Sequence, residues 1–352
     1  MRRYEIDRLD RCALYTLLTT ALMNLIIFPY HKNFLIPSEL YSHFPTVIHP
    51  FWEHFPKSRN LNKLTRGIEN SASTYTLPSS GQLFCFVETS EKHYDDRVPS
   101  IASTWLPKCD NGRFFTKTPL PNGTLSFSTV FRNLEDSYYD LFRKTFLGFY
   151  YSYAYISRDF DWYLKADDDN YFVMDHLKEY LSTLDPSEPL YLGYRMKPFL
   201  KDGYNSGGPG YILSNAALRI FVEHLYSDEE LCPYDWAEDR GMGRCLASMG
   251  ILPADTRDEK GKHRFIPFLP NELSEIPAGY HYYPLNVSWN TLADILENSH
   301  NQQLNHLQNG SLISEKFVSL HRVSPRKMIF LHSILYPESG KRLFTPEFFE
   351  LL

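Results

Sequence analysis

Residues 161–171 read DWYLKADDDNY, and this stretch is the strongest indication of the fold. The apolar run at 162–164 is typical of a buried strand, and it leads directly into three consecutive aspartates. Because residues i and i+2 of an extended segment face the same side, Asp167 and Asp169 are expected to point together and Asp168 the other way. Adjacent carboxylates repel unless a cation or hydrogen-bond donors compensate them. Oxygen ligands suit Mg²⁺ or Mn²⁺, so the pattern favours a divalent-metal site.

A calcium-binding loop and a helix cap are the alternatives to this metal site. An EF-hand loop that began at Asp167 would need Gly at its sixth position and Glu at its twelfth. This chain has Phe172 and Lys178 there, so an EF-hand is excluded. Capping of the next helical segment by Asp169 or Asn170 stays open, but it accounts for one acid and not for three.

Outward from the triplet, short apolar runs alternate with segments of helical character. The runs at 82–87, 113–116 and 162–164 predict strands, and the segments through 101–105 and over 135–155 predict helices. This alternation implies an α/β fold with a Rossmann-like, mostly parallel, doubly wound sheet. In such sheets ligands bind beyond the carboxyl ends of the strands, which is where the aspartates fall.

A glycine cluster follows the triplet. Residues 205–214 read NSGGPGYILS and place three glycines within four positions. Glycine lets the backbone approach a ligand closely and adopt positive φ. The cluster has neither the Gly-Lys-Ser/Thr of a Walker loop nor the spacing of a dinucleotide fingerprint. It predicts a tight turn, and whether that turn touches a ligand stays open.

A second acidic pair, Glu238 and Asp239, opens a segment of helical character that runs to Met249. A carboxylate at a helix N-terminus is stabilised by the helix macrodipole and could act as a general base toward a hydroxyl group. Ordinary capping of the helix by the same acids is the competing interpretation.

Composition narrows the classes of function. The 352 residues carry 42 acidic and 36 basic side chains, a net charge of −6, which disfavours a nucleic-acid partner. Aromatic residues make up 16% of the chain. A few of them flank the glycine cluster and the second acidic pair and are candidates for stacking on a sugar or a base, whereas others fall at helical spacing and are expected in the core. The candidates are Tyr204, Tyr211, Trp236 and the aromatics of 280–283, and the expected core residues are Phe142, Phe146 and Phe149.

The N-terminus predicts a membrane anchor. Residues 12–30 are almost wholly apolar, and at about 1.5 Å per residue they are long enough for a thin bilayer. Four arginines precede them, which by the positive-inside rule places residues 1–11 in the cytosol and the rest of the chain in a lumen. The polar, Pro-punctuated residues 31–80 are expected to form a stem. A cleaved signal peptide and a buried core helix are the alternatives to the anchor.

An oxidising lumen suits the remaining cysteines. Cys12 falls in the apolar span, and the other four allow three connectivities, of which the locally closed one has the smallest entropic cost. It joins Cys85 to Cys109 and Cys232 to Cys245. No spacing typical of zinc sites is present. Three sequons, at Asn122, Asn286 and Asn309, are expected to carry N-linked glycans in the same compartment.

Five segments in order carry a resemblance to a known family. They are Thr104-Trp105 with Cys109, the run WYLKADDD from Trp162, the run GYNSGGPGY from Gly203, Glu238-Asp239 with Cys245, and the run SLH at 319–321. Over residues 82–335 the chain resembles the β-1,3-galactosyltransferase-like glycosyltransferases, and most of all their core 1 branch. This resemblance implies a type II Golgi membrane protein with a GT-A catalytic domain over 81–340 and a C-terminal tail over 341–352.

The resemblance also implies an inverting reaction and its metal. Galactose would pass from UDP-galactose, in β-1,3 linkage, to N-acetylgalactosamine on Ser or Thr of a glycoprotein. Asp167, Asp169 and His321 would hold Mn²⁺, or Mg²⁺, on the diphosphate. Asp239 would be the base that takes the proton from the acceptor's 3-hydroxyl group.

Further roles follow from the same resemblance. Thr89, Arg97, Asp167 and Asp168 would contact the nucleotide, and the residues at the donor or acceptor sugar would be Tyr204, Gly207, Gly208, Trp236 and Glu238. A homodimer is compatible with the family. The turn at 88–91 reads ETSE where the core 1 branch commonly has Thr-Gly-Pro. A different donor or acceptor and a non-catalytic, chaperone-like relative are the alternative functions.

Overall fold

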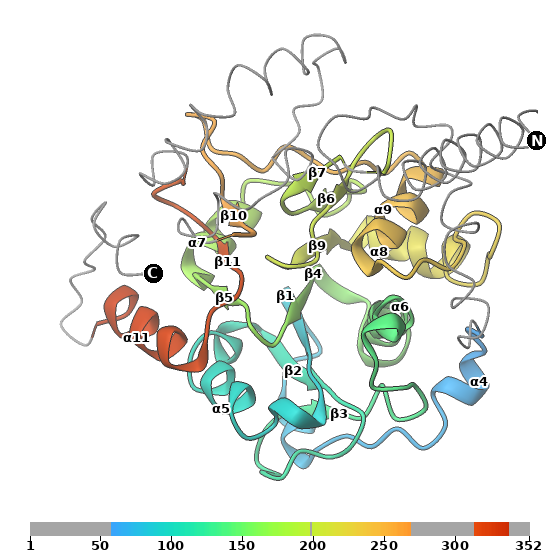
Figure 1. Ribbon diagram of the computed structural model, residues 1–352, viewed down its shortest axis with the longest axis horizontal. Helices are drawn as coiled ribbons and strands as arrows, with labels where there is room; N and C mark the ends of the chain where they lie inside the picture. Colours follow the sequence, from blue (N-terminus) through green and yellow to red (C-terminus); the bar gives the residue numbers. More distant parts are fainter. Residues whose placement is uncertain (1–57, 198, 269–312, 338–352) are drawn as a thin grey trace, which may run out of the picture. The chain divides into compact units, whose positions relative to one another are not determined.

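The computed structural model describes residues 58–197, 199–268 and 313–337, all within one unit that spans Ile48–Leu352 (Figure 1). Among these residues no helix combines the length and the apolar character that a bilayer crossing needs. Several sequence predictions fall outside the described residues and stay predictions. They are the tail over 1–11, the anchor over 12–30, the tail over 341–352, the sequons at Asn286 and Asn309, and the aromatics of 280–283.

The centre of the fold is a six-stranded sheet in the order β3-β2-β1-β4-β9-β6 (Figure 1). The four strands from β3 to β4 are parallel, whereas β9 runs antiparallel to both β4 and β6. The expected mostly parallel α/β sheet is therefore confirmed, with β9 as its one antiparallel strand. The strands span Ser80–Glu88 (β1), Asn111–Phe115 (β2), Phe127–Ser128 (β3), Asp159–Asp167 (β4), Tyr191–Leu192 (β6) and Tyr211–Ser214 (β9).

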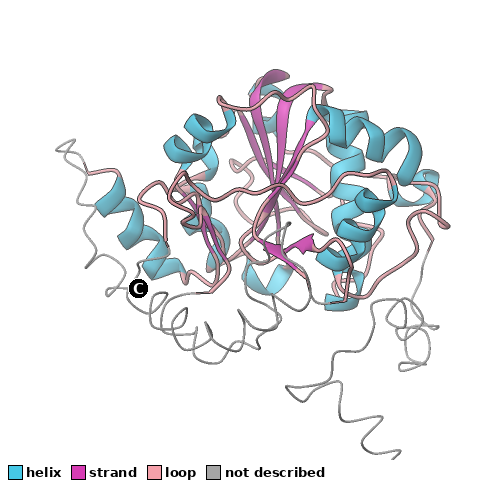
Figure 2. Cartoon of the chain, turned by 90° about the horizontal axis from the view of Figure 1, so that it is seen from above, coloured by secondary structure: helices cyan, strands magenta, loops and turns pink. Residues whose placement is uncertain are grey.

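Helices cover both faces of this sheet (Figure 2). The side chains of β1 alternate between two cores: Leu83 and Val87 join one hydrophobic cluster, and Phe84 and Phe86 join the other. This follows from the period of two in a strand that is buried on both faces. The first cluster receives α5 (Arg97–Ala102), α7 (Met174–Leu181) and α11 (Pro325–Leu335), and the second receives α6 (Leu141–Tyr151), α8 (Asn215–Ile220) and α9 (Glu238–Ser248).

Aromatic packing accounts for much of the second cluster. The Phe142 and Phe146 rings stack with centroids 4.0 Å apart, and Phe149 meets Phe86 edge-on at 5.0 Å. The expectation that these three phenylalanines belong to the core is confirmed. The helix expected over 135–155 is narrower, because α6 is preceded by the 3₁₀ turn Tyr138–Asp140 and followed by a π-helical turn, Ser152–Ile156.

Smaller elements complete the described chain. The helix α4 (Leu61–Leu64) comes before the sheet. A three-stranded sheet pairs β10 (Phe265–Ile266), β11 (Ser319–Leu320) and β5 (Tyr171–Phe172), and a two-stranded sheet pairs β7 (Arg195–Met196) with β8 (Tyr204–Asn205). Through the three-stranded sheet the chain near residue 320 lies beside the segment that follows the aspartates.

Both expected disulfides are present. Cys85 in β1 is bonded to Cys109 just before β2, and Cys232 is bonded to Cys245 in α9. Because each bond closes a short loop, it restricts the unfolded chain near the strand or helix that it anchors. The local pairing predicted from the sequence is confirmed.

The expected stem over 31–80 is described only from Ser58, and this part belongs to the compact unit. Arg59 is buried, donates to the carbonyls of Tyr226 and Cys232, and lies over the rings of Phe142 and Phe146 at 5.5 and 5.3 Å from their centroids. Carbonyls in a loop need donors when they are buried, and the guanidinium supplies them. Residues 58–80 therefore help to hold the body together.

We expect Arg59→Ala to lower the free energy of unfolding by about 2–4 kcal/mol, because it leaves two buried carbonyls without a donor. The exposed Arg66 is a matched control, and Arg66→Ala is expected to change stability by less than about 0.5 kcal/mol. Denaturant unfolding of both variants is the measurement. Equal stabilities of the two variants would show that residues 58–80 act as a passive stem.

Candidate functional site

The candidate site lies at the carboxyl edge of the central sheet. Strands β1 and β4 are parallel neighbours, and their register pairs Glu88 with Asp167 at the ends of the two strands. Thr89 and Asp168 therefore leave the sheet side by side. The position agrees with the rule that ligands bind beyond the carboxyl ends of parallel strands.

Asp168 is held by two of the three other residues predicted to contact a nucleotide, Thr89 and Arg97. The Thr89 hydroxyl donates to one carboxylate oxygen at 2.8 Å, and the Arg97 guanidinium donates to the other at 2.6 Å. Burial raises the pKa of Asp168, while these two partners act in the opposite direction. The structure thus brings Thr89, Arg97 and Asp168 together, and the Arg97 side chain comes from the first turn of α5.

Asp169 faces His321, which the family resemblance predicts as a metal ligand. Asp169 Oδ1 is buried with no hydrogen-bond partner among the described residues, and it lies 3.7 Å from His321 Nε2. His321 Nδ1 is 2.9 Å from the carbonyl of Pro267, which can only accept, so Nδ1 carries the proton. In the neutral imidazole Nε2 is then an acceptor. Two acceptors that face each other across this gap fit a cation between them.

Asp167 does not join this pair as the i, i+2 rule predicts. Its carboxylate lies 2.7 Å from Lys165 Nζ, whereas Asp168 and Asp169 both contact Arg97, at 2.6 and 3.4 Å. The reason is that β4 ends at Asp167, where the Asn170 side chain accepts from the Asp167 backbone N–H at 2.7 Å and closes a turn. The described chain contains no group of three or more His, Cys, Asp or Glu residues that could hold a metal.

The alternative interpretation, that Asp169 or Asn170 caps the next helix, does not hold. Helix α7 begins at Met174, its cap position is Val173, and no side chain caps it. The carboxylates of the triplet instead face Lys165, Arg97, Thr89 and His321.

Lys165 is a site residue that the sequence patterns did not reveal. Its side chain is buried, and its Nζ lies 2.7 Å from Asp167 and 3.6 Å from Glu238. Burial alone would lower the pKa of Lys165, but the charges of Asp167, Glu238 and Glu88 raise it well above its usual value. The available signal was a lysine inside an otherwise apolar strand, because a buried lysine needs acidic partners.

Two buried glutamates share this positive charge. Burial raises the pKa of Glu88 to about 8 and that of Glu238 to about 7. The Thr145 hydroxyl donates to Glu88 at 2.7 Å, and the Tyr211 hydroxyl donates to Glu238. One lysine therefore lies among more carboxyl groups than it can neutralise, and proton uptake by a glutamate balances the charge.

Asp239 is held by backbone donors in the first turn of α9. One carboxylate oxygen accepts from Gly207 N–H at 3.0 Å and the other from Arg240 N–H at 2.8 Å. The cap position of the helix is Ala237, with no side-chain cap, so neither Glu238 nor Asp239 is the N-cap. Burial raises the pKa of Asp239. A carboxylate with a fixed direction and raised proton affinity suits a general base.

Two consecutive glycines join the acidic pair to the histidine. A Cβ at Gly207 would lie 2.8 Å from Glu238 Oε2, and a Cβ at Gly208 would lie 2.6 Å from His321 Nδ1. Only residues without a side chain allow this approach. The cluster predicted as a tight turn is therefore the backbone that runs between Asp239 and His321.

Asn170 fixes this turn to the aspartates. It is fully buried, its side chain donates to the carbonyl of Gly208, and its own backbone carbonyl accepts from Trp105 Nε1 at 2.9 Å. From the sequence, an asparagine directly after three aspartates is expected only as a helix cap. Its contacts instead connect β4, the glycine cluster and the segment that follows α5.

Two of the aromatic residues expected beside a sugar are core residues instead. Tyr204 is 3% exposed in β8, where it packs against Gly243 of α9, and Tyr211 is fully buried in β9. Neither side chain can offer a face to a sugar, because both rings are covered by the surrounding residues. Trp236 is partly exposed and close to Asp239 in the sequence, so it remains a candidate for stacking on a sugar.

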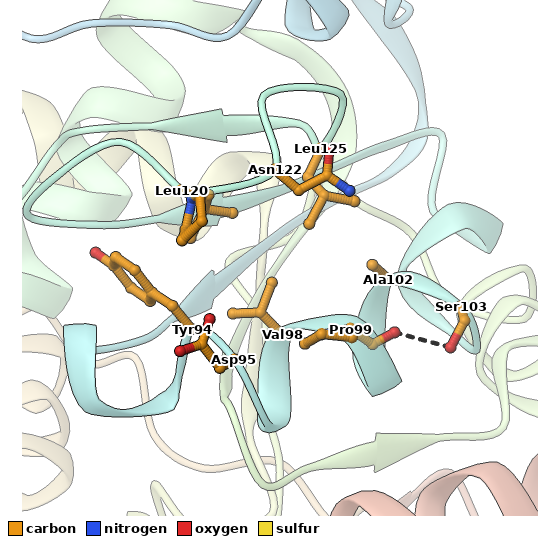
Figure 3. Close-up of a pocket in the computed structure, with 10 residues that line it drawn as sticks. Tyr94, Asp95, Val98, Pro99, Ala102, Ser103, Leu120, Asn122 and Leu125 are labelled. Atoms are coloured by element: carbon orange, nitrogen blue, oxygen red, sulfur yellow. Dashed lines mark hydrogen bonds between the residues drawn. The ribbon is translucent and has the colours of Figure 1, made fainter.

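A cavity of about 360 Å³ lies apart from these residues, between α5 and the segment 120–125 (Figure 3). Its walls are mainly apolar, and of the predicted site residues only Asn122 lines it. Asn122 is exposed, and its side-chain oxygen accepts from the backbone and hydroxyl of Thr124. The cavity has no part in the arrangement of carboxylates described above.

Comparison with known proteins identifies the class. Residues 79–248 match the family described as Fringe-like. The matched part of the chain contains the aspartates, the glycine cluster and Asp239. The expected resemblance to the β-1,3-glycosyltransferases is confirmed by this match and by the relatives.

Individual relatives carry related names. The chain is 26% identical over 278 residues to glycoprotein-N-acetylgalactosamine 3-beta-galactosyltransferase 1 of Xenopus laevis, which covers 76% of this chain and 70% of the relative. It is 31% identical over 196 residues to chondroitin sulfate synthase 3 of Mus musculus, and this match covers 49% of this chain and 22% of the relative. It is 26% identical over 233 residues to beta-1,3-glucosyltransferase of Mus musculus, and this match covers 63% of this chain and 45% of the relative. The chain thus spans less than half the length of the last two relatives.

We expect Lys165→Met to lower the free energy of unfolding by about 3–5 kcal/mol, because it leaves Asp167 and Glu238 without their buried counter-charge. Lys178 pairs with Asp110 at 2.8 Å on the surface, so Lys178→Met is the matched control and is expected to cost less than about 1 kcal/mol. Denaturant unfolding compares them. Equal losses in the two variants would mean that Lys165 does not hold the acids in place.

The pKa of Glu88 predicts a pH-dependent stability. Because the folded-state pKa is raised from 4.5 to about 8, the stabilising contribution of protonated Glu88 is fully present below pH 4.5 and is lost as the pH rises through 8. Glu88→Gln cannot ionise, so its stability relative to wild type should rise by at least about 1 kcal/mol between pH about 5 and about 8.5. Urea unfolding at both pH values measures this, with the exposed Glu188→Gln as control. A difference that is constant with pH would contradict the assignment.

Proposed function

We propose that the protein is an inverting, metal-dependent glycosyltransferase that transfers galactose from UDP-galactose, in β-1,3 linkage, to N-acetylgalactosamine on Ser or Thr of glycoproteins. One observation carries the proposal: Gly207 and Gly208 run from a candidate base, Asp239, to His321, whose Nε2 faces the buried, unpartnered Oδ1 of Asp169. A base and a metal-fitting pair joined by glycine backbone provide the two functions that sugar transfer from a nucleotide needs.

The donor would bind at the carboxyl ends of β1 and β4. Asp169 and His321 would hold Mn²⁺ or Mg²⁺, with Asp167 close by on Lys165. The bound cation would offset the negative charge of the leaving diphosphate. Thr89, Arg97 and Asp168 would contact the nucleotide, and their mutual hydrogen bonds fix their side chains before it arrives.

The acceptor would bind on the side of α9. Its 3-hydroxyl oxygen would form a bond to the anomeric carbon while the bond from that carbon to the diphosphate breaks, and its proton would pass to Asp239. A single displacement from the opposite side converts the α linkage of the donor into the β linkage of the product. The backbone donors on both oxygens of Asp239 keep the carboxylate oriented, and burial strengthens it as a base.

The names of the relatives support a transferase, and the identities of the donor and acceptor sugars are what the experiment has to test. The names include a galactosyltransferase, a glucosyltransferase and a chondroitin sulfate synthase. Another donor or acceptor, and a non-catalytic role, are therefore outcomes of the same experiment. The apolar span over 12–30 and the two disulfides support a single-pass type II protein of the Golgi with its catalytic part in the lumen.

The test measures sugar transfer by the full chain to a GalNAc-peptide in the presence of Mn²⁺ and a panel of UDP-sugars. We expect UDP-galactose to be the preferred donor. Asp169→Asn and Asp239→Asn should each lower turnover by at least about 100-fold. Asp239→Asn should still bind UDP with Mn²⁺, whereas Asp169→Asn should bind it less well, because of these two variants only Asp169→Asn loses a metal ligand.

The exposed Asp185, in the turn after α7, provides a control, and Asp185→Asn should keep wild-type turnover. Full activity of Asp169→Asn or Asp239→Asn would overturn the role given to that residue. Preference for another donor would redirect the specificity, and absence of transfer from every donor would favour the non-catalytic, chaperone-like alternative.

A further inference from the structure

Three aromatic side chains near Asp239 are not explained by the core. Tyr138 is 66% exposed and Phe199 is 42% exposed, although large aromatic residues are usually buried in a fold of this size. Trp236 is partly exposed. Phe199 also has a φ of 73°, which a residue with a side chain rarely adopts. Exposed aromatic residues beside a catalytic group mark a binding surface more often than scattered surface residues do.

Arg240 fixes two of these rings beside the candidate base. Its guanidinium carbon lies 5.3 Å from the centroid of the Phe199 ring and 5.4 Å from that of Trp236. The same guanidinium is anchored by Asp235, to which Nε donates at 2.9 Å. The backbone N–H of Arg240 donates to Asp239 at 2.8 Å. The residue that orients the carboxylate of Asp239 therefore also positions the two rings.

Tyr138 approaches the same acids from the turn before α6. Partial burial raises the pKa of Tyr138, and the charges of Asp239 and Asp167 raise it further. The turn is fixed to the segment that leads into α9, because the Tyr234 hydroxyl donates to the carbonyl of Tyr139 at 2.7 Å. The Tyr138 ring itself stays open to solvent.

We propose that Tyr138, Phe199 and Trp236 form a subsite for the pyranose ring of the acceptor and direct its hydroxyl group toward Asp239. A pyranose has an apolar face of C–H groups and a rim of hydroxyls, so it matches flat aromatic rings beside a carboxylate. The inference rests on the proposed function and deepens it, because it names the side chains that would hold the acceptor on this side of α9. The Tyr138 and Phe199 positions follow from the structure and not from any sequence motif.

The test uses the full chain and a GalNAc-peptide, and it measures both transfer and equilibrium binding of the peptide. Tyr138→Ala and Phe199→Ala should each raise the acceptor KM and the peptide Kd about tenfold, which corresponds to about 1.4 kcal/mol. The donor KM should change by less than about twofold, because the residues proposed to contact the nucleotide come from the ends of β1 and β4 and from α5. Tyr138→Phe and Phe199→Tyr keep the rings and should restore both values.

Tyr75 is the matched control, since it is 79% exposed on the 3₁₀ turn Ala72–Thr76, and Tyr75→Ala should leave both constants unchanged. Wild-type acceptor constants in Tyr138→Ala and Phe199→Ala would overturn the subsite while the proposed transfer stood. If the wild type binds the peptide but transfers no sugar to it, and binding weakens in these variants, the subsite is supported and the proposed transfer is overturned. A wild type that neither binds the peptide nor transfers sugar to it would overturn both.

Discussion

The buried ion pairs of Lys165 hold the acidic site together. Its ammonium group lies in the sheet between Asp167 and Glu238, and the carboxyl of Glu88 adds to the negative charge around it. Desolvated charges of one sign cannot gather at a strand end without a counter-charge. Lys165 supplies it, and it links the end of β4 to the first turn of α9. The donor side and the base side of the proposed reaction therefore share one buried cation that comes from the protein itself.

The close approach of backbone at Gly207 and Gly208 is a second requirement of the site. Any side chain at these positions would collide with Glu238 or His321. Asn170 then ties the same turn to the aspartates, and Trp105 ties Asn170 to the segment after α5. Charge compensation and close packing thus converge on one small region. The part of the chain that matches the Fringe-like family contributes every residue of this region except His321, which enters from beyond residue 248 through the three-stranded sheet.

Much of the fold followed from local patterns. The alternating strands and helices, the mostly parallel sheet, the phenylalanine core and both disulfides could be predicted, because periodicity and short loop closure depend on neighbours in sequence. The sequence patterns predicted less well where strands end and which side chains other layers cover. The expected common face of Asp167 and Asp169 is absent because β4 stops at Asp167, and Tyr204 and Tyr211 are core residues because other layers cover their strands.

The chemical groups of the site are already evident in the linear chain: three aspartates after a strand, a glycine turn, an acidic pair at a helix start and a histidine. Which of these groups lie together in the site depends on the tertiary structure. Folding places Lys165 and Glu88 among the acids, pairs Asp168 with Arg97, and sets Asp169 against His321, which lies 152 positions later in the chain (321 − 169). The field around a buried carboxylate is set by the charges and donors that surround it in space, and those come from segments that no local pattern relates to one another.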